Sequence, residues 1–330
     1  MKTNTEGSSS IHLYGCGGCG INLVTPFGLA EDRDGYAETR VSLIDTSRSN
    51  ITEEQLDADM DFFLITDEGE GSGKVRRDNA ATISDNVKQA LIKQPPADFN
   101  VVVFSASGGS GSVIGPLLMK ELLTQNIPVV AIVVGSSESS ITATNTLNTL
   151  KSLSLIGNQL DKPTVITYQH NSAVTKRSTV DEICTATIHT LAALCSHQNE
   201  ELDQRDVRNW TFYNHSTSVE PQLSLLEVCS TAEGASKITS PISVASLLTD
   251  KDQPAPELYP EYSCIGYRTQ GLGDGLTEVH YVISIGGIAE LIQIRNSEVD
   301  KYTQSTQGRV GTGKKILSDA DTGDIGGLIF

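Results

Sequence analysis

Short apolar runs alternate with longer amphipathic stretches through the first two thirds of the chain. The runs are rich in β-branched residues and lack a strict apolar–polar alternation, which is typical of strands buried on both faces. They lie at residues 11–14, 41–44, 101–104, 129–134 and 164–168. Strands separated by helices predict a parallel sheet covered on both sides, and we therefore expect an α/β, Rossmann-like domain.

Two amphipathic stretches are clear enough to predict helices. One follows Ser112, and its apolar face contains Ile114, Leu117, Leu118 and Leu122. The other covers residues 178–197, and about twenty residues at a rise of 1.5 Å each span roughly 30 Å. Its apolar stripe contains Val180, Cys184, Ile188, Leu191 and Cys195. We expect a core helix that joins two distant ends of the molecule.

The pattern changes beyond Trp210. Strand-like runs at 242–248, 263–268 and 278–285 are separated by loops with Pro and Gly, which predicts a smaller α+β domain. We divide the chain into a first domain at 1–177, a central helix and its following loop at 178–209, a C-terminal domain at 210–318 and an acidic tail at 319–330. The tail contains Asp319, Asp321 and Asp324 and ends in Leu328, Ile329 and Phe330. Its apolar end predicts a docking segment.

Composition narrows the class of protein. The chain has 330 residues, and its formal net charge of −17 argues against direct binding of nucleic acid. No stretch is apolar enough to span a membrane, and the first ten residues lack the apolar core of a secretory signal. We expect a cytoplasmic protein without membrane contact, and we expect its six cysteines to be free thiols.

A glycine-rich turn follows the first predicted strand. Gly15, Cys16, Gly17, Gly18, Cys19 and Gly20 match the dinucleotide pattern G-x-G-x-x-G, with Asn22 in the next helix and Asp45 after the next strand. Taken alone, this turn favours an NAD-dependent oxidoreductase. The spacing of the two cysteines also occurs in zinc knuckles, but no second pair accompanies them, so we expect no metal bound by side chains.

A second glycine-rich turn follows the strand at 101–104. It consists of Ser107, Gly108, Gly109, Ser110, Gly111 and Ser112, and Pro116 marks the start of the next helix. A dinucleotide domain has no use for this second turn. Two glycine-rich loops at the carboxyl ends of parallel strands can hold a triphosphate from two sides, because their backbone N–H groups approach an anion closely.

A third glycine-containing loop lies at residues 70–74. It differs from a Walker A loop, which needs Gly where Glu68 stands and Ser or Thr where Val75 stands. We therefore reject the Walker assignment and expect Gly71, Ser72 and Gly73 beside the same phosphates.

Together these loops resemble the tubulin/FtsZ family. Residues 107–112 are similar to the family's phosphate-binding signature, with Ser110 in place of the usual Thr and Val113 in place of the final Gly. Residues 15–22 look like the first phosphate loop of FtsZ. Residues 107–116, followed by 145–153, are especially similar to the PhuZ group of bacteriophage tubulin-like proteins. The resemblance covers at least residues 11–210.

The resemblance implies a site for GTP and GDP, with Mg²⁺ held through the phosphates. It places the nucleotide on the three loops described above, together with Asp45 and Thr46. It also assigns guanine recognition to Asn22, Asn171 and Asp181, and a carboxylate is suited to the two adjacent donors of guanine. For Asp181 the alternative is an acid in the first turn of a helix, where it favours the helix dipole.

Two acids, Asp203 and Asp206, follow the long predicted helix. Three residues apart, they share one side of a helical turn, and they lie at the end away from the glycine-rich loops. They resemble the catalytic loop of FtsZ, whose acids act on the nucleotide of the next subunit. Glu201 stands where that loop usually has Asn. Without the resemblance, a solvated acidic turn is the alternative.

The resemblance implies a GTPase that polymerises head to tail with copies of itself. Hydrolysis at the contact then weakens the filament, and the tail helps to join subunits. The phage relatives imply a role in positioning phage material inside an infected bacterium. Two alternatives remain at this point: the NAD-dependent oxidoreductase, and a nucleotide-binding scaffold that polymerises without hydrolysis.

Overall fold

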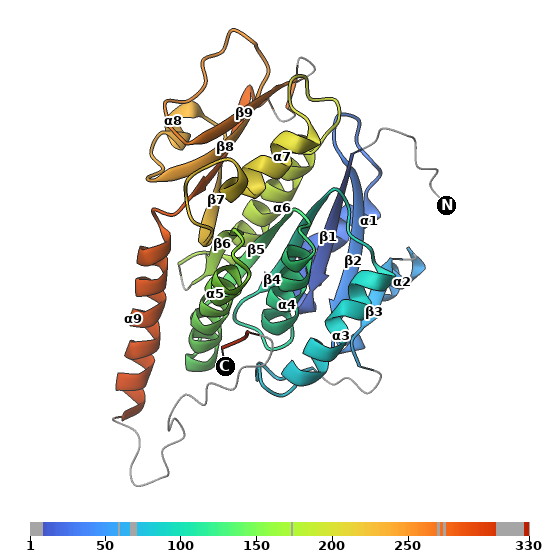
Figure 1. The fold of residues 1–330 in the computed structure, drawn as a ribbon. Helices are drawn as coiled ribbons and strands as arrows, with labels where there is room; N and C mark the ends of the chain where they lie inside the picture. The colour runs from blue at the N-terminus through green and yellow to red at the C-terminus, as the bar shows by residue number, and fades with distance from the viewer. Residues whose placement is uncertain are drawn as a thin grey trace.

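One sheet runs through the part of the chain that the structure describes. This computed structural model describes residues 9–58, 60–66, 71–172, 174–268, 271–272, 275–307 and 327–329. Its strands follow the order β3-β2-β1-β4-β5-β6-β7-β10-β8-β9 (Figure 1). Their bounds are β1 (Ser10–Cys16), β2 (Glu38–Asp45), β3 (Asp61–Leu64), β4 (Phe99–Ser105), β5 (Val129–Ser136), β6 (Thr164–Asn171), β7 (Leu223–Cys229), β8 (Pro241–Leu248), β9 (Tyr262–Tyr267) and β10 (Glu278–Ser284).

The first six strands are all parallel. Five of them were predicted from the sequence, and the edge strand β3 was not. The chain builds β2 and β3 on one side of β1 and β4 to β6 on the other, so the winding direction reverses between β1 and β4. In sheets of this kind, ligands bind at that switch point, beyond the carboxyl ends of the strands. The two glycine-rich turns begin at the ends of these two strands.

Helices cover both faces of this sheet. Their bounds are α1 (Gly17–Leu29), α2 (Glu53–Asp57), α3 (Ala80–Lys93), α4 (Gly111–Thr124), α5 (Ser140–Leu160), α6 (Arg177–Leu194), α7 (Gln204–Thr211), α8 (Ala232–Ala235) and α9 (Ile288–Gln307), with short 3₁₀ turns η1 (Arg48–Asn50) and η2 (Tyr213–His215). Along β4, Val101 and Val103 pack with α1 and α6, and Val102 and Phe104 pack with α3, α4 and α5. A strand buried on both faces explains why the apolar run lacks alternation.

The long central helix is α6, and it ends at Leu194 rather than at His197. The amide of Asn199 donates hydrogen bonds to the carbonyl oxygens of Ala193 (2.9 Å) and Leu194 (2.9 Å). The Ala193 carbonyl also accepts from the backbone N–H of Ser196 (3.2 Å), so the Asn199 side chain and the backbone after the helix together close its end. The apolar stripe of the helix is buried, as predicted.

The C-terminal strands extend the same sheet. Strand β7 pairs parallel with β6 through Thr164–Leu223 and two further pairs, and β10 then runs antiparallel between β7 and β8. Trp210, fully buried, fills this junction and donates a hydrogen bond from Nε1 to the carbonyl of Tyr281 (3.1 Å). The smaller α+β unit is thus joined to the first through backbone pairing.

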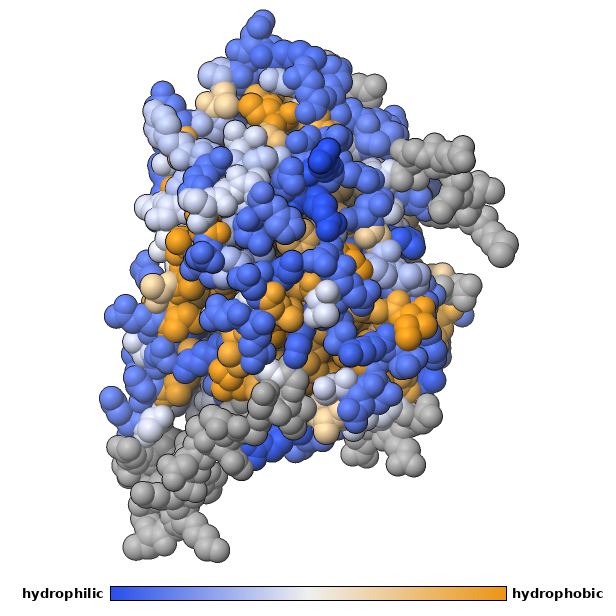
Figure 2. Space-filling model, in the orientation of Figure 1, coloured by the Kyte–Doolittle hydropathy of each residue, from blue (hydrophilic) through white to orange (hydrophobic). Residues whose placement is uncertain are grey.

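The surface in the view of Figure 2 is mostly hydrophilic in its upper half. Apolar side chains gather in the lower half, over the region of α3, α4, α5 and α9. Among the described helices, none is both long enough and apolar enough to cross a bilayer. The acids Asp319, Asp321 and Asp324 and the terminal Phe330 lie outside the described residues.

Candidate functional site

A cavity of about 650 Å³ opens at the carboxyl ends of the parallel strands. Its lining comes from the ends of β1, β2, β4, β5 and β6 and from the N-terminal parts of α1, α4 and α6. The cavity therefore occupies the switch point of the sheet, and the N-termini of α1 and α4 both face it. Helix N-termini carry unpaired N–H groups and a positive dipole end, so this position favours an anion.

The two glycine-rich turns touch backbone to backbone. A Cβ added to Gly17 would lie 2.8 Å from the nitrogen of Gly111, and one added to Gly111 would lie 2.6 Å from the oxygen of Cys16. Gly17 also has a φ of 68°, where side chains are strained. The two turns thus form one continuous surface of backbone atoms, which suits a chain of phosphates.

The third loop closes on the second through hydroxyl groups. The Ser110 hydroxyl lies 2.6 Å from that of Thr46 and donates to that of Ser72 at 3.4 Å. A Cβ on Gly109 would lie 1.6 Å from the Ser72 oxygen, so the loops also pack closely. Ser72 and Gly71 line the cavity, as predicted for a third phosphate loop.

Asn145 of α5 links the second and third loops through hydrogen bonds. Its side-chain nitrogen donates to the carbonyl oxygens of Lys74 (2.9 Å), Ser107 (3.1 Å) and Gly108 (3.3 Å). Two loops distant in sequence therefore share one buried amide. This role of Asn145 was not predicted from the sequence, although a polar residue on the inner face of an amphipathic helix is a signal for it.

The three residues assigned to guanine all line the cavity. Asn22 comes from α1, Asn171 from the end of β6 and Asp181 from α6. Within the described part of the chain, the side-chain oxygen of Asn171 is buried without a hydrogen-bond partner, which leaves it an acceptor for a ligand. Asp181 is the fifth residue of α6, so the alternative of a first-turn acid is wrong.

Asp45 organises the wall at the end of β2. Its carboxylate accepts from the backbone N–H of Thr46 (2.7 Å) and from the side-chain nitrogen of Asn50 (2.7 Å). Burial raises the pKa of Asp45, and these hydrogen bonds oppose the shift. Both carboxylate oxygens accept hydrogen bonds, so Asp45 stabilises the loop after β2 and also lines the cavity.

Three charged residues of the lining were not assigned from the sequence. Lys74 is the last residue of the third loop, and Glu138 and Arg177 are partly exposed, with their side chains 2.8 Å apart. The hydrogen bond from Arg177 lowers the pKa of Glu138. Lys74 and Arg177 supply positive charge to the cavity of an otherwise acidic protein.

Some assigned residues support the cavity without lining it. Gly15 packs beneath α1, where a Cβ would lie 2.5 Å from Val24. The Ser112 hydroxyl donates to the carbonyls of Gly108 (2.7 Å) and Gly109 (2.9 Å), which fixes the second turn. Thr46 is fully buried, and Gly73 lies beside the lining residues of its loop; neither is part of the lining.

The two cysteines of the first turn do not form a metal site with other residues. No group of three or more metal-ligating side chains occurs within the described ranges, and all six cysteines are free. Burial raises the pKa of Cys19 to about 12, so its thiol stays protonated at neutral pH.

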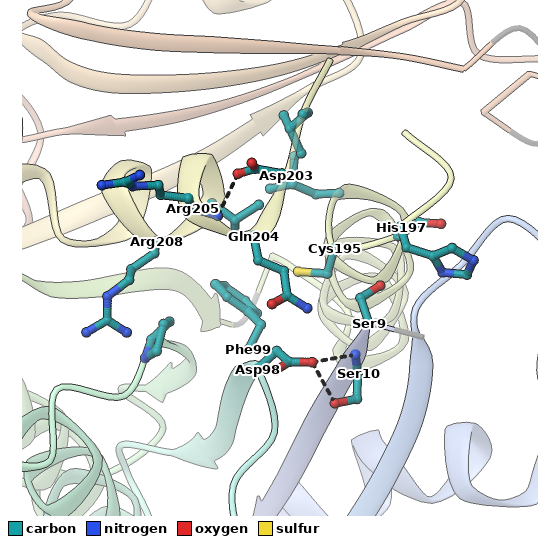
Figure 3. Close-up of a pocket in the computed structure, with 15 residues that line it drawn as sticks. Ser9, Ser10, Asp98, Phe99, Cys195, His197, Asp203, Gln204, Arg205 and Arg208 are labelled. Carbon is teal, nitrogen blue, oxygen red and sulfur yellow. Dashed lines mark hydrogen bonds between the residues drawn. The ribbon is translucent and has the colours of Figure 1, made fainter. Parts of the chain in front are cut away.

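The acids Asp203 and Asp206 lie at the opposite edge of the sheet. Asp203 lines a separate cavity of about 530 Å³ with Ser10 and Phe99, which begin β1 and β4 (Figure 3). The glycine-rich turns follow the other ends of these strands. From Ser10 to Cys16, six steps of about 3.3 Å separate the two edges by roughly 20 Å. These acids therefore cannot reach a phosphate in the cavity of their own subunit.

The two acids are held in a defined arrangement. Asp203 is the N-cap of α7, and its Oδ1 accepts from the backbone N–H groups of Arg205 (2.7 Å) and Asp206 (3.0 Å). The hydroxyl of Tyr262 donates to Oδ1 of Asp206 (3.2 Å). Across the described residues, Oδ2 of Asp203 accepts no hydrogen bond, so this exposed oxygen is available to a water molecule or another subunit.

The backbone conformation at Glu201 is one that favours Asn at this position. Its φ is 62°, in the left-handed region that Asn tolerates better than most residues. Lys251 lies 2.9 Å from the carboxylates of both Glu200 and Glu201. This ion pair holds the turn that leads to Asp203.

Comparison with known proteins agrees with this geometry. Residues 10–176 match the profile of the tubulin/FtsZ family GTPase domain, and residues 202–288 match that of the phage tubulin-like protein C-terminal domain. The chain is 30% identical to the phage tubulin-like protein of Pseudomonas phage phiKZ over 96% of this chain and 97% of that protein. It is also 30% identical to that of Pseudomonas phage PhiPA3 over 84% of this chain and 86% of that protein.

A solved protofilament of TubZ from bacteriophage PhiKZ has the same fold. The TM-score is 0.83 at 26% identity, over 98% of this chain and 99% of the other. These matches remove the NAD-dependent oxidoreductase as an alternative. The chain belongs to the tubulin/FtsZ family and joins that family's GTPase domain to the C-terminal domain of the phage tubulin-like proteins.

Proposed function

We propose that this protein binds GTP in the cavity at the switch point and hydrolyses it only at a contact between two copies. The observation that carries the proposal is the separation of Asp203 and Asp206 from the glycine-rich turns by the length of β1. A site divided in this way is complete when the α7 edge of one subunit meets the cavity of another.

The chemistry suits such a divided site. Hydrolysis of GTP needs a positioned triphosphate, neutralised charge and an oriented water more than covalent catalysis. The backbone of the two glycine-rich turns would hold the phosphates, and Lys74 would add a positive charge. Mg²⁺, when bound, would neutralise phosphate oxygens. Asp203 and Asp206 of the neighbour would orient the water that attacks the γ-phosphorus, with GDP as the leaving group.

Base recognition would come from the residues assigned to guanine. Asp181 would accept from the two adjacent N–H groups of guanine, and the buried oxygen of Asn171 would accept a further donor. Adenine lacks that pair of donors, so this arrangement favours GTP over ATP.

A contact between opposite edges is head to tail. Such contacts produce an open filament when the rotation between subunits does not close a ring. Hydrolysis at the contact would weaken it, so the filament would turn over. Because the sequence relatives come from Pseudomonas phages, we place this filament in the cytoplasm of an infected bacterium, where it would position phage material.

The concentration dependence of hydrolysis tests this proposal. The rate of phosphate release per subunit should rise steeply with protein concentration, together with light scattering from filaments. A rate per subunit that stays constant over a hundredfold dilution would show that one copy suffices. Filaments without phosphate release would support the non-hydrolysing scaffold instead.

A further inference from the structure

The end of strand β6 extends beyond its neighbour β7. Residues 166–171 pair with β5, whereas β7 pairs with residues 164–166 alone. In the part of the sheet that the structure describes, residues 167–171 are therefore paired on one edge only. This end carries Asn171, whose buried side-chain oxygen is assigned to guanine. A segment with few backbone pairs opens easily, so its last residue needs other contacts to stay in place.

Helix α9, which lies beside α5, supplies such contacts (Figure 1). His170 precedes Asn171, and successive side chains of a strand point to opposite faces. The Nη1 atom of Arg295 lies 2.8 Å from Nδ1 and 2.6 Å from Nε2 of the His170 ring. Arg295 is 8% exposed and also lies 2.9 Å from the carboxylate of Glu298. The guanidinium is thus held between an imidazole of β6 and a carboxylate of its own helix.

The surroundings of His170 suit this contact. An arginine can only donate, so the ring must accept from it, and a neutral imidazole has an acceptor nitrogen. Burial and the charge of Arg295 lower the pKa of His170 to about 4, so the ring is neutral at pH 7. Gly135 lies opposite His170 in β5, and a Cβ there would lie 2.9 Å from Nδ1 and 2.1 Å from the hydroxyl of Tyr168. Glycine therefore leaves the space that both rings occupy.

The same helix also holds the end of β5. Ser136 is the residue paired with Asn171, and both line the nucleotide cavity. The hydroxyl of Ser137 donates to Oε1 of Glu298 at 3.2 Å, and the hydroxyl of Tyr302 donates to the carbonyl of Ser137 at 2.6 Å. Side chains of α9 thus hold residues next to both members of this pair.

We propose that Arg295 is a positioning residue for the choice of base: through His170 it fixes Asn171, so that the buried oxygen meets guanine. The inference rests on the proposed nucleotide site. Asp181 would accept from the ring N–H and one amino N–H of guanine, which leaves the second amino N–H for Asn171. Inosine has no amino group, so the binding of ITP does not depend on this oxygen.

Comparison of GTP with ITP tests the proposal. Competition against a fluorescent GTP analogue measures both affinities at a protein concentration too low for assembly. Arg295→Met keeps an unbranched side chain but has no donor. Its affinity for GTP should fall by about three- to tenfold, the range for one hydrogen bond, while its affinity for ITP should change by less than about twofold. Lys301→Met, the same charge change at an exposed residue of α9, should change neither affinity.

A second pair of variants tests the link from the side of the strand. His170→Phe keeps an aromatic ring but cannot accept from Arg295, whereas His170→Gln keeps an acceptor. The Phe variant should show the selective loss of GTP affinity, and the Gln variant should retain most of the preference. This pair decides the question even if Arg295→Met fails to fold. Equal losses in both variants would overturn the role of the hydrogen bond.

A double-mutant cycle tests whether Arg295 acts through Asn171. In an Asn171→Ala background, Arg295→Met should cause no further loss of GTP affinity, because the oxygen to be positioned is absent. Additive losses would show that Arg295 acts elsewhere and would overturn the proposal.

The outcomes separate this proposal from the one on which it rests. If the unmodified chain binds no guanine nucleotide, the proposed function fails, and the positioning role fails with it. If that chain binds GTP but does not prefer it to ITP, or if Arg295→Met weakens both nucleotides equally, only the role of Arg295 is overturned. A loss confined to GTP is the result that we expect.

Discussion

Asp203 and Asp206 hold each other's backbone at the start of α7. Oδ1 of Asp203 accepts from the N–H of Asp206 at 3.0 Å, and Oδ2 of Asp206 accepts from the N–H of Asp203 at 3.1 Å. This reciprocal arrangement is a capping box. It fixes the position of two carboxylates on an exposed edge, so the same residues that start a helix can also present acids to a neighbour.

Removal of one charge from this pair should separate binding from hydrolysis. Asp206→Asn keeps an acceptor for the backbone of Asp203, so α7 should start normally. We expect unchanged GTP binding, hydrolysis lower by about 100-fold or more, and filaments that persist; the loss of an oriented base is typically of this size. Asp206→Ala should behave alike. Phosphate release and nucleotide binding are both measured.

The control is Glu200→Gln, which removes one charge from the same exposed turn and contacts Lys251 instead of α7. It should leave hydrolysis nearly unchanged. If Asp206→Asn loses GTP binding while keeping its fold, these acids belong to the binding site and their assignment to the neighbour's nucleotide is wrong.

Lys74 should contribute to phosphate binding. It lines the cavity as the last residue of the third loop, and hydrogen bonds to charged groups are worth about 1.5–3 kcal/mol. Lys74→Gln should therefore weaken GTP binding by about tenfold or more, and Lys74→Arg should restore part of it. Lys88→Gln on α3 makes the same charge change far from the cavity. If the two Gln variants bind GTP with equal affinity, Lys74 does not contribute to phosphate binding.

Stability should fall in mild acid because His12 is buried in its neutral form. Its Nδ1 lies 3.0 Å from the carbonyl of Pro95, and its Nε2 lies 2.7 Å from the hydroxyl of Ser42. A neutral imidazole suits both contacts, because one ring nitrogen donates to the carbonyl and the other accepts from the hydroxyl. Burial lowers the pKa of His12 to about 4. The folded state therefore binds fewer protons than the unfolded state between about pH 6.5 and 4.

The contribution of His12 is complete above pH 6.5 and declines as the pH falls towards 4. At pH 5.5 the free energy of unfolding should be lower by about 1.4 kcal/mol because of His12. Urea unfolding at pH 7.5 and 5.5, without nucleotide, measures it. His12→Gln retains a donor and an acceptor but cannot titrate, so its stability should change less between the two values. An equal change in both proteins would contradict this cause.

Deletion of residues 319–330 should raise the critical concentration for assembly or abolish assembly. The acids Asp319, Asp321 and Asp324 would meet basic residues of a neighbour, and this attraction should weaken with salt. Light scattering at several salt concentrations measures the effect. Unchanged assembly after the deletion would leave the tail without a role in joining subunits.

Local patterns predicted much of the fold and many of the residues that line the cavity. The buried β-branched runs predicted the parallel strands. The glycine-rich turns predicted where the cavity lies, because a glycine such as Gly17, with a φ of 68°, marks a special backbone within its own segment. The continuation of the sheet from β6 to β7 could not be predicted from local sequence patterns. It depends on pairs such as Thr164–Leu223, between residues far apart in sequence.

The residues missed in the cavity have the same explanation. Glu138 follows β5 and Arg177 begins α6 after β6, and the two become neighbours only when β5 and β6 pair. Asn145 binds loops after two other strands, so nothing in its own helix shows what it holds. The contact from Arg76 to Ile329 spans most of the chain, and no local pattern marks it.

Mixing two inactive variants tests the divided site most directly. Gly109→Val should fail to bind nucleotide, because a Cβ there would lie 1.6 Å from the Ser72 hydroxyl, and it keeps both acids. Asp206→Ala binds nucleotide but offers an incomplete pair to its neighbour. If the site is shared between subunits, a mixture of the two should hydrolyse GTP well above the sum of their separate rates. A mixture that only equals this sum would contradict hydrolysis across the contact.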